Sequence, residues 1–443
     1  MIVRLSIFTA LLMISFCAEL GFAQTGKTTL ATATGFRFTE DDLSADARKL
    51  YDQEATLIAE NRKSLFNEWI YAQLTDLEAK ARNTTPEKVE SEALSAIQKP
   101  TEVQIKAVYD TNRQTIGGRS LEEVRPNIVD YLKREAEEKQ VNMLFDSLKA
   151  KYKFNPLKEP GITVNSADVL ASIGARRITV GEFEMANRIA LYNFRASIYE
   201  QVRADLENMI YAKLLDAEAA KRNTDAGGLI AAEITNKLKD YSDYERLKLE
   251  DELQDKLFRT YAVKFTSHMI EPQVLNVSVD DDPSIGPSTA KVTVVAFVDF
   301  QCSACSAFSP LMKQVIAEFG ANVRLVVRDF PLKQIHEHGI DAALAGYAAR
   351  RQGKFFEMAE MMYRNQDALD GTSLARYAKE LGMNVEQFER DRHSPEALAE
   401  VTKDIADGNS YGVNGTPTVF INGIKLQRLT TARLRAAIQN ALI

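Results

Sequence analysis

The stretch that decides the fold of the C-terminal part is VTVVAFVDFQCSACSAF, Val292–Phe308. Residues 292–300 form an apolar run that is typical of a strand buried on both faces. The helical pattern of Phe308–Phe319 follows almost at once, and Cys302 and Cys305 lie between the two. The sequence therefore predicts a strand, a Cys-x-x-Cys pair and a helix in immediate succession.

This placement has a chemical consequence for the first cysteine. The unpaired N–H groups and the dipole at a helix N-terminus favour a thiolate over a thiol. A free thiol with a pKa of ~8.5 is only about 3% ionised at pH 7, whereas a pKa of ~5 would make it almost wholly thiolate. We therefore expect Cys302 to be the nucleophile, exposed at the helix start, and Cys305 to be the more buried resolving thiol of a redox-active disulfide.

The first 23 residues predict an export signal. One positive charge in Met1–Arg4 precedes the uncharged run Leu5–Ala18, and Gly21–Ala23 offers a cleavage site after Ala23. The apolar run is shorter than the ~20 residues that a membrane span needs. Lipid attachment at Cys17 and an uncleaved signal anchor remain as alternatives. The expected location is periplasmic or otherwise extracytoplasmic.

Few residues of the chain can bind a metal ion or form a disulfide: it has three cysteines and four histidines among 443 residues. Cleavage after residue 23 removes Cys17, so Cys302 and Cys305 are the only thiols of the mature chain. A disulfide-stapled scaffold is thereby excluded, and an exported protein meets an oxidising environment. Two other uses of the pair stay open. One is a structural bridge, whose short loop gives only ~2 kcal/mol, and the other is a zinc site completed by His336 and His338.

The charge balance limits the class of partner. The chain carries 55 Lys+Arg against 62 Asp+Glu, a net charge of −7, and has no long basic run. This argues against nucleic acid as the main partner. No cofactor and no metal are expected.

A repeat occupies the N-terminal half. IYAQLTDLEAKARNT (Ile70–Thr84) and IYAKLLDAEAAKRNT (Ile210–Thr224) match at ten of fifteen positions, at a constant offset of 140. Both copies are predicted to be helical and to contain very long helices, so we expect two all-α modules, 24–162 and 163–273. The length agrees with about three domains, the third being an α/β domain over 274–443.

The helical half resembles the N-terminal domain of SurA-type periplasmic chaperones. The resemblance is carried by the repeated Ile-Tyr-Ala-x-Leu helix and by the helices that begin near Thr101–Lys106 and Leu121–Arg125. It implies that this half binds unfolded polypeptide. Only about a dozen residues separate the last two helices of the first copy, so no prolyl isomerase activity is expected. The simpler alternative is that its apolar stripes, Trp69 included, form the core between helices.

A second segment supports a redox domain in the C-terminal part. Gly415–Phe420 places Pro417 directly before an apolar strand, more than a hundred residues after the cysteines. With the strand–Cys-x-x-Cys–helix unit, this has the form of the thioredoxin fold. The chain from Val277 to Ile443 resembles DsbA-family thiol:disulfide oxidoreductases, which have a helical insertion in that fold. The matching motifs are Asp281-Asp282-Pro283, Gly286-Pro287, Val298 to Cys305, Asp329-Phe330-Pro331-Leu332, Gln352-Gly353-Lys354-Phe355-Phe356 and Gly415-Thr416-Pro417.

The resemblance implies roles for individual residues. Cys302 attacks, Cys305 resolves, and a cis Thr416-Pro417 presents its backbone to the substrate peptide. Two departures from the family's motifs bear on how strongly oxidising the cysteine pair is. The residues between the cysteines are Ser303-Ala304, without an imidazole, and the family's buried acid six residues before the first cysteine is here Ala296.

The leading hypothesis is an exported thiol:disulfide oxidoreductase behind two chaperone-like helical modules. Its expected partners are cysteine-containing exported polypeptides and a membrane protein that recycles the active site, and the helical modules hold clients or form a homodimer. Two alternatives remain: a holdase with a secondary redox role, and a disulfide isomerase or reductase. Asp299 is expected to be a structural or surface acid, with the role of a proton acceptor as the alternative.

Overall fold

The computed structural model describes residues 27–161, 165–266 and 271–443. The predicted export signal and Cys17 lie outside these residues. The chain divides into two compact units, residues 54–191 and residues 27–53 with 192–443, and the division falls inside two long helices. In the part of the chain described, no helix combines the length and apolar character that a membrane span requires.

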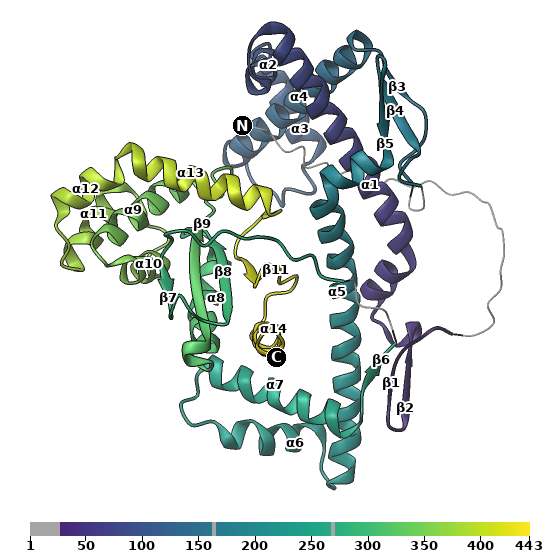
Figure 1. Cartoon of the computed structure of the whole chain (residues 1–443), viewed down its shortest axis with the longest axis vertical. Coiled ribbons are helices and arrows are strands. Elements are labelled where there is room, and N and C mark those ends of the chain that lie inside the picture. Colours follow the sequence, from purple (N-terminus) through teal and green to yellow (C-terminus); the bar gives the residue numbers. More distant parts are fainter. Residues whose placement is uncertain (1–26, 162–164, 267–270) are drawn as a thin grey trace. The chain divides into compact units, whose positions relative to one another are not determined.

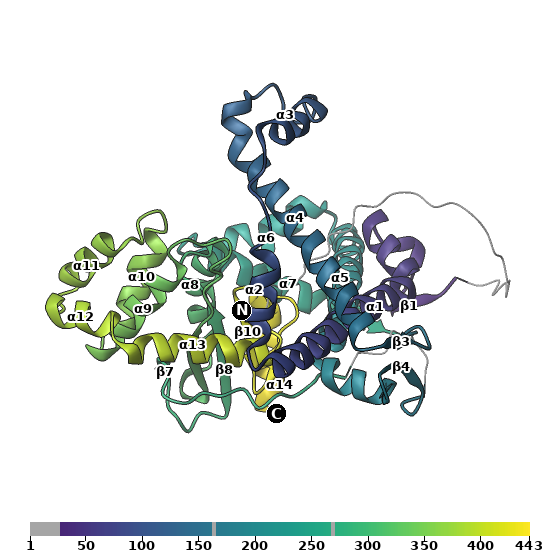
Figure 2. The same ribbon diagram turned by 90° about the horizontal axis from the view of Figure 1, so that it is seen from above.

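The N-terminal half is mostly helical, which confirms the predicted fold class. Among the residues described, the first copy has four α-helices and the second copy three, and Figure 2 shows α3 at one end of α4. The helices are α1 (Ala45–Arg82), α2 (Pro86–Leu94), α3 (Glu102–Thr111), α4 (Leu121–Lys151), α5 (Val180–Lys221), α6 (Ala226–Glu233) and α7 (Asp243–Thr260).

Each copy also contains a β-hairpin, which the all-α prediction missed. In the first copy it consists of β1 (Thr29–Ala33) and β2 (Phe36–Thr39), and in the second of β4 (Val169–Ile173) and β5 (Arg176–Thr179). The two hairpins are related by the same offset of 140 residues and have their register shifts at equivalent positions. Such short strands give too few residues for a period-two pattern to stand out.

The third strand of each small sheet comes from the other copy. β6 (Lys264–Phe265), at the end of the second copy, pairs with β1 of the first copy. β3 (Phe154–Pro156), at the end of the first copy, pairs with β4 of the second copy. The two copies therefore exchange strands reciprocally.

The hydrophobic cores follow the same exchange. One core buries Phe38 of the first hairpin against Ile210 and Leu257 of the second copy's helices. The other buries Phe183, which follows the second hairpin, with Ile70 of the first copy. Neither copy forms these cores from its own residues alone. Each compact unit therefore contains residues of both predicted modules, 24–162 and 163–273. The predicted boundary separates the two copies of the repeat along the sequence.

The C-terminal domain is built on a five-stranded sheet of order β11-β10-β8-β9-β7, in which only β8 and β9 run parallel. The predicted strand at 274–279 is reduced to a single bridge between Val274 and Ile424, and its apolar side chains Leu275, Val277 and Val279 pack against a core of the domain instead. The strands are β7 (Ser284–Ile285), β8 (Val292–Val298), β9 (Val323–Asp329), β10 (Thr418–Ile421) and β11 (Ile424–Lys425).

Both faces of this sheet are buried, as the apolar run of β8 predicts. Alternate residues of β8 enter the two cores: Val294 and Ala296 face one, and Val295 and Phe297 face the other. Figure 1 shows α9 to α13 gathered beside the sheet, the helical insertion expected from the sequence. The helices are α8 (Ser303–Ala317), α9 (Gly339–Arg351), α10 (Phe355–Arg364), α11 (Gly371–Glu380), α12 (Val385–Arg392), α13 (Pro395–Ser410) and α14 (Thr431–Leu442).

A charged cluster joins this domain to the helices of its own compact unit. Arg435 of α14 pairs with Asp251 of α7 at 2.8 Å and with Glu318 at 2.9 Å. Glu318 is the C-terminal cap of α8, whereas Cys302 is its N-terminal cap. The attachment therefore lies at the end of α8 that is remote from the cysteines.

Candidate redox site

The cysteine pair lies where the sequence predicts it, between β8 and α8. Cys302 is the N-cap of α8 in an extended conformation, and its carbonyl accepts the Ser306 N–H at 3.1 Å. Both cysteines are free thiols in this structure. Cys302 is 8% exposed and Cys305 1%. The order of burial agrees with the expected roles, but Cys302 is less exposed than expected because residue 416 lies against it.

The start of α8 strongly acidifies Cys302. Its pKa is lowered to about 5, first by a hydrogen bond with the Cys305 thiol and further by the backbone N–H groups of Ala304 and Cys305, against an opposing effect of burial. These are donors that α8 leaves free in its first turn. The acidification thus needs no side chain between the cysteines, so Ser303-Ala304 does not prevent it.

The pKa of Cys305 is shifted in the opposite direction. Burial raises the pKa of its thiol far above the usual value, and the neighbouring Cys302 adds to this rise. Cys305 therefore keeps its proton while Cys302 ionises. The pair can carry one thiolate and one thiol, which is the state that attacks a disulfide and then resolves the mixed disulfide.

Thr416 and Pro417 face the pair from the other side. The Thr416-Pro417 peptide bond is cis, as the resemblance implies. The Cys302 thiol donates to the Thr416 carbonyl oxygen across 3.3 Å. The nearby Thr416 side chain lowers the pKa of both cysteines, and its buried hydroxyl has no hydrogen-bond partner among the residues described. The Thr416 carbonyl thus accepts from the thiol, and the hydroxyl is left free to donate to a thiolate.

Gln366 is a contributor that the sequence did not reveal. Its Nε2 donates to the carbonyl oxygens of Phe300 at 2.8 Å and Cys302 at 2.9 Å. It lies just after α10, more than sixty residues along the chain from the cysteines, so no local motif signals it. It links the insertion to the turn that carries Cys302.

Tyr363, the second such contributor, lies in α10, three residues before Gln366. Its ring packs against Phe300 with centroids 5.4 Å apart, and its carbonyl accepts the Ser306 hydroxyl at 3.0 Å. Burial, together with the nearby Cys305, raises its pKa well above the usual value. The phenol is therefore neutral and forms a wall beside the pair.

Asp299 is a buried acid whose contacts agree with the structural role expected for it. It is 1% exposed. One carboxylate oxygen accepts the Gln301 N–H at 2.8 Å, and the other accepts the Leu332 N–H and lies 2.7 Å from His336 Nδ1. The loop after β9 is thereby fixed to the turn before Cys302. His336 is engaged by this carboxylate and not by the cysteines, which weakens the zinc alternative.

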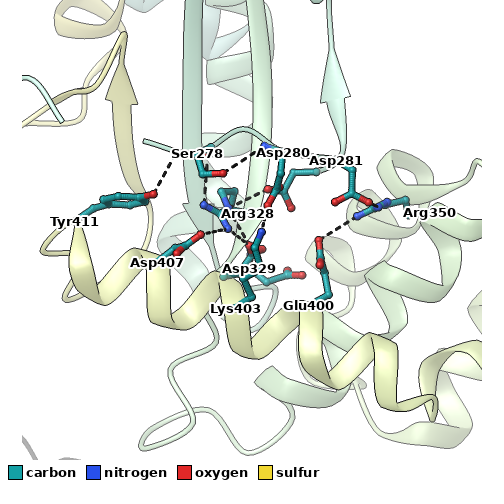
Figure 3. Close-up of polar contacts among 12 residues, drawn as sticks. Ser278, Asp280, Asp281, Arg328, Asp329, Arg350, Glu400, Lys403, Asp407 and Tyr411 are labelled. Atoms are coloured by element: carbon teal, nitrogen blue, oxygen red, sulfur yellow. Dashed lines mark hydrogen bonds and ion pairs between the residues drawn. The ribbon is translucent and has the colours of Figure 1, made fainter. Parts of the chain in front are cut away.

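A second concentration of charge lies on the other side of the sheet (Figure 3). Arg328 is fully buried, and its guanidinium contacts Asp282 and Asp407 at 2.9 Å and also Asp404. Burial and the neighbouring Asp404 raise the pKa of Asp282 to about 8. Burial also raises the pKa of Asp329 well above its usual value, and one oxygen of this carboxylate has no hydrogen-bond partner in the residues described.

Three carboxylates of this cluster approach one another closely enough to share a cation. Asp280, Asp282 and Glu400 each offer an oxygen within 4.8 Å of the others, and they form the one such group of possible metal ligands among the residues described. Each is already paired with a basic side chain: Lys403, Arg328 and Arg350 respectively. We therefore assign the cluster to the stability of the domain.

Comparison with known families finds a match for the C-terminal region. Residues 278–440 match the family model described as Thioredoxin. Together with the sheet order and the strand–cysteine–helix unit, this gives the C-terminal region a thioredoxin-like fold. The match does not include the helical half, where the resemblance to SurA-type chaperones stays a prediction.

The curated relatives are longer proteins. The chain is 40% identical to Na(+)/H(+) antiporter NhaA 1 of Mycolicibacterium vanbaalenii over 151 residues, 34% of this chain and 24% of that protein. It is 37% identical to Na(+)/H(+) antiporter NhaA of Herminiimonas arsenicoxydans over 172 residues, 38% of this chain and 27% of that protein. The chain thus spans about a quarter of the length of the curated relatives it matches.

The alignments with similar solved structures include part of this chain and most of each solved chain. A thioredoxin-like oxidoreductase from Silicibacter pomeroyi is 30% identical, with 37% of this chain and 93% of that chain covered and a TM-score of 0.34. BdbD from Bacillus subtilis is 20% identical, with 39% and 99% covered and a TM-score of 0.34. The catalytic domain of Proteus mirabilis ScsC is 20% identical, with 37% and 92% covered and a TM-score of 0.33.

Proposed function

We propose that this chain is an extracytoplasmic, DsbA-like thiol:disulfide oxidoreductase that acts on cysteines of exported polypeptides. The observation that carries the proposal is the acidified Cys302. It lies at the start of α8 with a pKa of about 5, beside a buried Cys305 that retains its proton and opposite the cis Thr416-Pro417 bond.

The reaction in the oxidising direction begins with the Cys302–Cys305 disulfide. A client thiolate attacks Cys302 Sγ, a new S–S bond joins client and protein, and the electron pair of the broken bond leaves on Cys305 Sγ, which takes up a proton. A second client thiolate then attacks the client sulfur, which forms the client disulfide and expels Cys302 as a thiolate. Two client thiols are oxidised, and one protein disulfide is reduced.

The low pKa of Cys302 favours this direction. A sulfur that is stable as a thiolate leaves readily, so a mixed disulfide with the client breaks toward reduced protein. A membrane redox partner would then reoxidise the pair. An isomerase or reductase remains the alternative, and the measured reduction potential separates them: a value near −120 mV marks a strong oxidant and one near −270 mV a reductant.

The direct test is the capture of clients by a variant that cannot resolve them. The Cys305→Ala chain should form covalent adducts with cysteine-containing polypeptides in an extracytoplasmic extract, and a thiol reductant should reverse these adducts. The matched control is Cys302→Ser with Cys305→Ala, which removes the nucleophile and leaves the rest of the surface unchanged. Equal adducts in the two variants, or none in either, would contradict the proposal.

A chaperone-like role of the helical half is the second candidate. The compact unit of residues 54–191 exposes large apolar side chains that no core of that unit uses: Val103 (79% exposed), Met185 (70%), Met143 (56%) and Tyr131 (50%). Exposed apolar side chains of this kind suit the binding of unfolded polypeptide. If this role is dominant, Cys302→Ser should suppress client aggregation as well as the wild type does, whereas Val103→Ser with Met185→Ser should suppress it less.

A further inference from the structure

A groove with several charged and hydroxyl-bearing side chains in its wall begins next to Cys305, at Ser306. It lies between α8 and α10, has a volume of about 350 Å³, and is lined by Ser306, Ser309, Lys313, Glu360 and Arg364 among others. Ser306 directly follows Cys305 in the chain, and its hydroxyl is bonded to the backbone of Tyr363, which is also a lining residue. The groove therefore shares its wall with the redox site.

The charges of the groove do not balance. Glu360 accepts an ion pair from Lys313 at 3.0 Å and another from Arg364 at 3.6 Å. Two cations thus share one carboxylate, which leaves an excess of one positive charge. The ammonium group of Lys313 also lies over the Phe356 ring, 5.5 Å from its centroid, which holds the side chain along the groove.

The dimensions match an extended peptide. Along α8, Ser306 lies about 6 Å and Lys313 about 16 Å beyond Cys302, at 1.5 Å per residue. An extended chain advances about 3.3 Å per residue, so a client residue about five positions from the attacked cysteine reaches Lys313. The hydroxyl groups of Ser306 and Ser309 can meet peptide N–H and C=O groups in between.

We propose that the α8–α10 groove is a client subsite that receives the polypeptide beside the reacting cysteine and prefers an acidic side chain about five residues from it. This inference rests on the proposed redox function and adds a substrate preference to it. The covalent step is unchanged: the client thiolate attacks Cys302 Sγ, and Cys305 Sγ leaves with the electron pair. The groove contributes attraction and alignment.

The test uses the oxidised full-length chain and single-cysteine peptides in excess. The peptides are identical except for Asp, Ser or Lys at the fifth position from cysteine, placed on either side in separate sets. Loss of the protein disulfide is measured over time by acid quenching and mass measurement. In one of the two sets, the Asp peptide should react roughly fivefold faster than the Lys peptide, which is the scale of an exposed ion pair.

Three variants give the groove a specific readout. Lys313→Gln with Arg364→Gln should abolish or reverse the preference for Asp, and Glu360→Gln should increase it. Lys379→Gln, an exposed lysine of α11 outside the groove, should leave it unchanged. Equal rates for all three peptides on both sides, or a preference that survives Lys313→Gln with Arg364→Gln, would overturn the inference.

Dithiothreitol separates this inference from the function on which it rests. It carries no side chain that reaches the groove, so all variants should react with it at wild-type rates. If neither dithiothreitol nor any peptide reduces the pair, the redox proposal itself fails. If dithiothreitol reacts and the peptides show no dependence on charge, only the groove proposal fails.

Discussion

The C-terminal domain buries ionisable groups in two places, with opposite effects on their acidity. At the start of α8 the pKa of Cys302 falls to about 5, whereas near Arg328 the pKa of Asp282 rises to about 8. Both groups are more than nine-tenths buried. The difference lies in what faces them: hydrogen-bond donors converge on the sulfur, whereas further carboxylates crowd Asp282.

Burial alone therefore does not determine reactivity. The cysteine site supplies N–H and O–H dipoles that are already oriented toward one anion. The Arg328 cluster has more carboxylates than cations, and retained protons relieve the excess. The first arrangement stabilises a thiolate, and the second connects β9 to α13.

Replacement of Cys302, the acidified group of the first site, should have the largest effect on activity. Cys302→Ser removes the group on which the first site is centred, and oxidation of reduced client peptides should fall by at least about 10³-fold, because a serine hydroxyl cannot form the disulfide. Ser303→Ala is the matched control and should retain activity near the wild-type level. Substantial oxidation by Cys302→Ser would place the chemistry elsewhere.

Removal of the buried guanidinium should break the second arrangement. Arg328→Met leaves Asp404 and Asp407 without their main partner, so the free energy of unfolding should fall by about 3–5 kcal/mol in urea denaturation. Arg350→Met is the control, because Arg350 is partly exposed and its ion pairs contribute about 1 kcal/mol or less. An equal loss in both variants would show that burial does not distinguish the two arginines.

Alkylation of the reduced chain should report the acidity of Cys302 directly. With a pKa of about 5 it is roughly 90% thiolate at pH 6, whereas a thiol of pKa ~8.5 is about 0.3% thiolate, a ratio of roughly 300. The iodoacetamide rate should therefore reach a plateau above pH 6 and fall toward pH 4. Thr416→Val, which removes one donor, should move the midpoint upward. A wild-type midpoint near 8 would contradict the acidification.

The pH dependence of stability should show the smallest effect. Asp282 is protonated below about pH 8 when folded and only below about pH 3.8 when unfolded. Folding therefore takes up a proton between these values, and the stabilisation is complete below pH 3.8 and is lost as the pH rises through 8. Asp282→Asn cannot lose a proton, so between about pH 6.5 and 8 it should lose on the order of 1–2 kcal/mol less stability than the wild type. Identical pH profiles would show that Asp282 does not titrate in this range.

The parts that the sequence predicted depend on neighbouring residues. The strand–Cys-x-x-Cys–helix unit lies within Val292–Phe308, and the structure places all of it as expected. The proline before β10 was also recognisable, because Gly415-Thr416-Pro417 precedes a clear apolar strand. Asn83 and Asn223, at equivalent positions of the repeat just after α1 and α5, both adopt left-handed conformations, with φ of 52° and 56°.

The parts that it did not predict depend on distant contacts. Gln366 lies 64 residues from Cys302 and His336 lies 37 residues from Asp299, and no periodic pattern connects them. The backbone N–H groups that help to acidify Cys302 were expected from its place at the helix start, but the contribution of Thr416, which lies 114 residues further along the chain, was not. In the helical half the offset of 140 was visible in the sequence, but which hairpin packs on which helix was not.

The strand exchange in the helical half has a consequence for assembly. A chain that carried a single copy of the repeat could complete its cores only with a second molecule, and its folding would then depend on protein concentration. Covalent joining of the two copies converts that encounter into an intramolecular one, at an effective concentration in the millimolar range for short linkers. The duplication therefore makes the helical half self-sufficient at any dilution, and a cut between the copies should leave two fragments that need each other in order to fold.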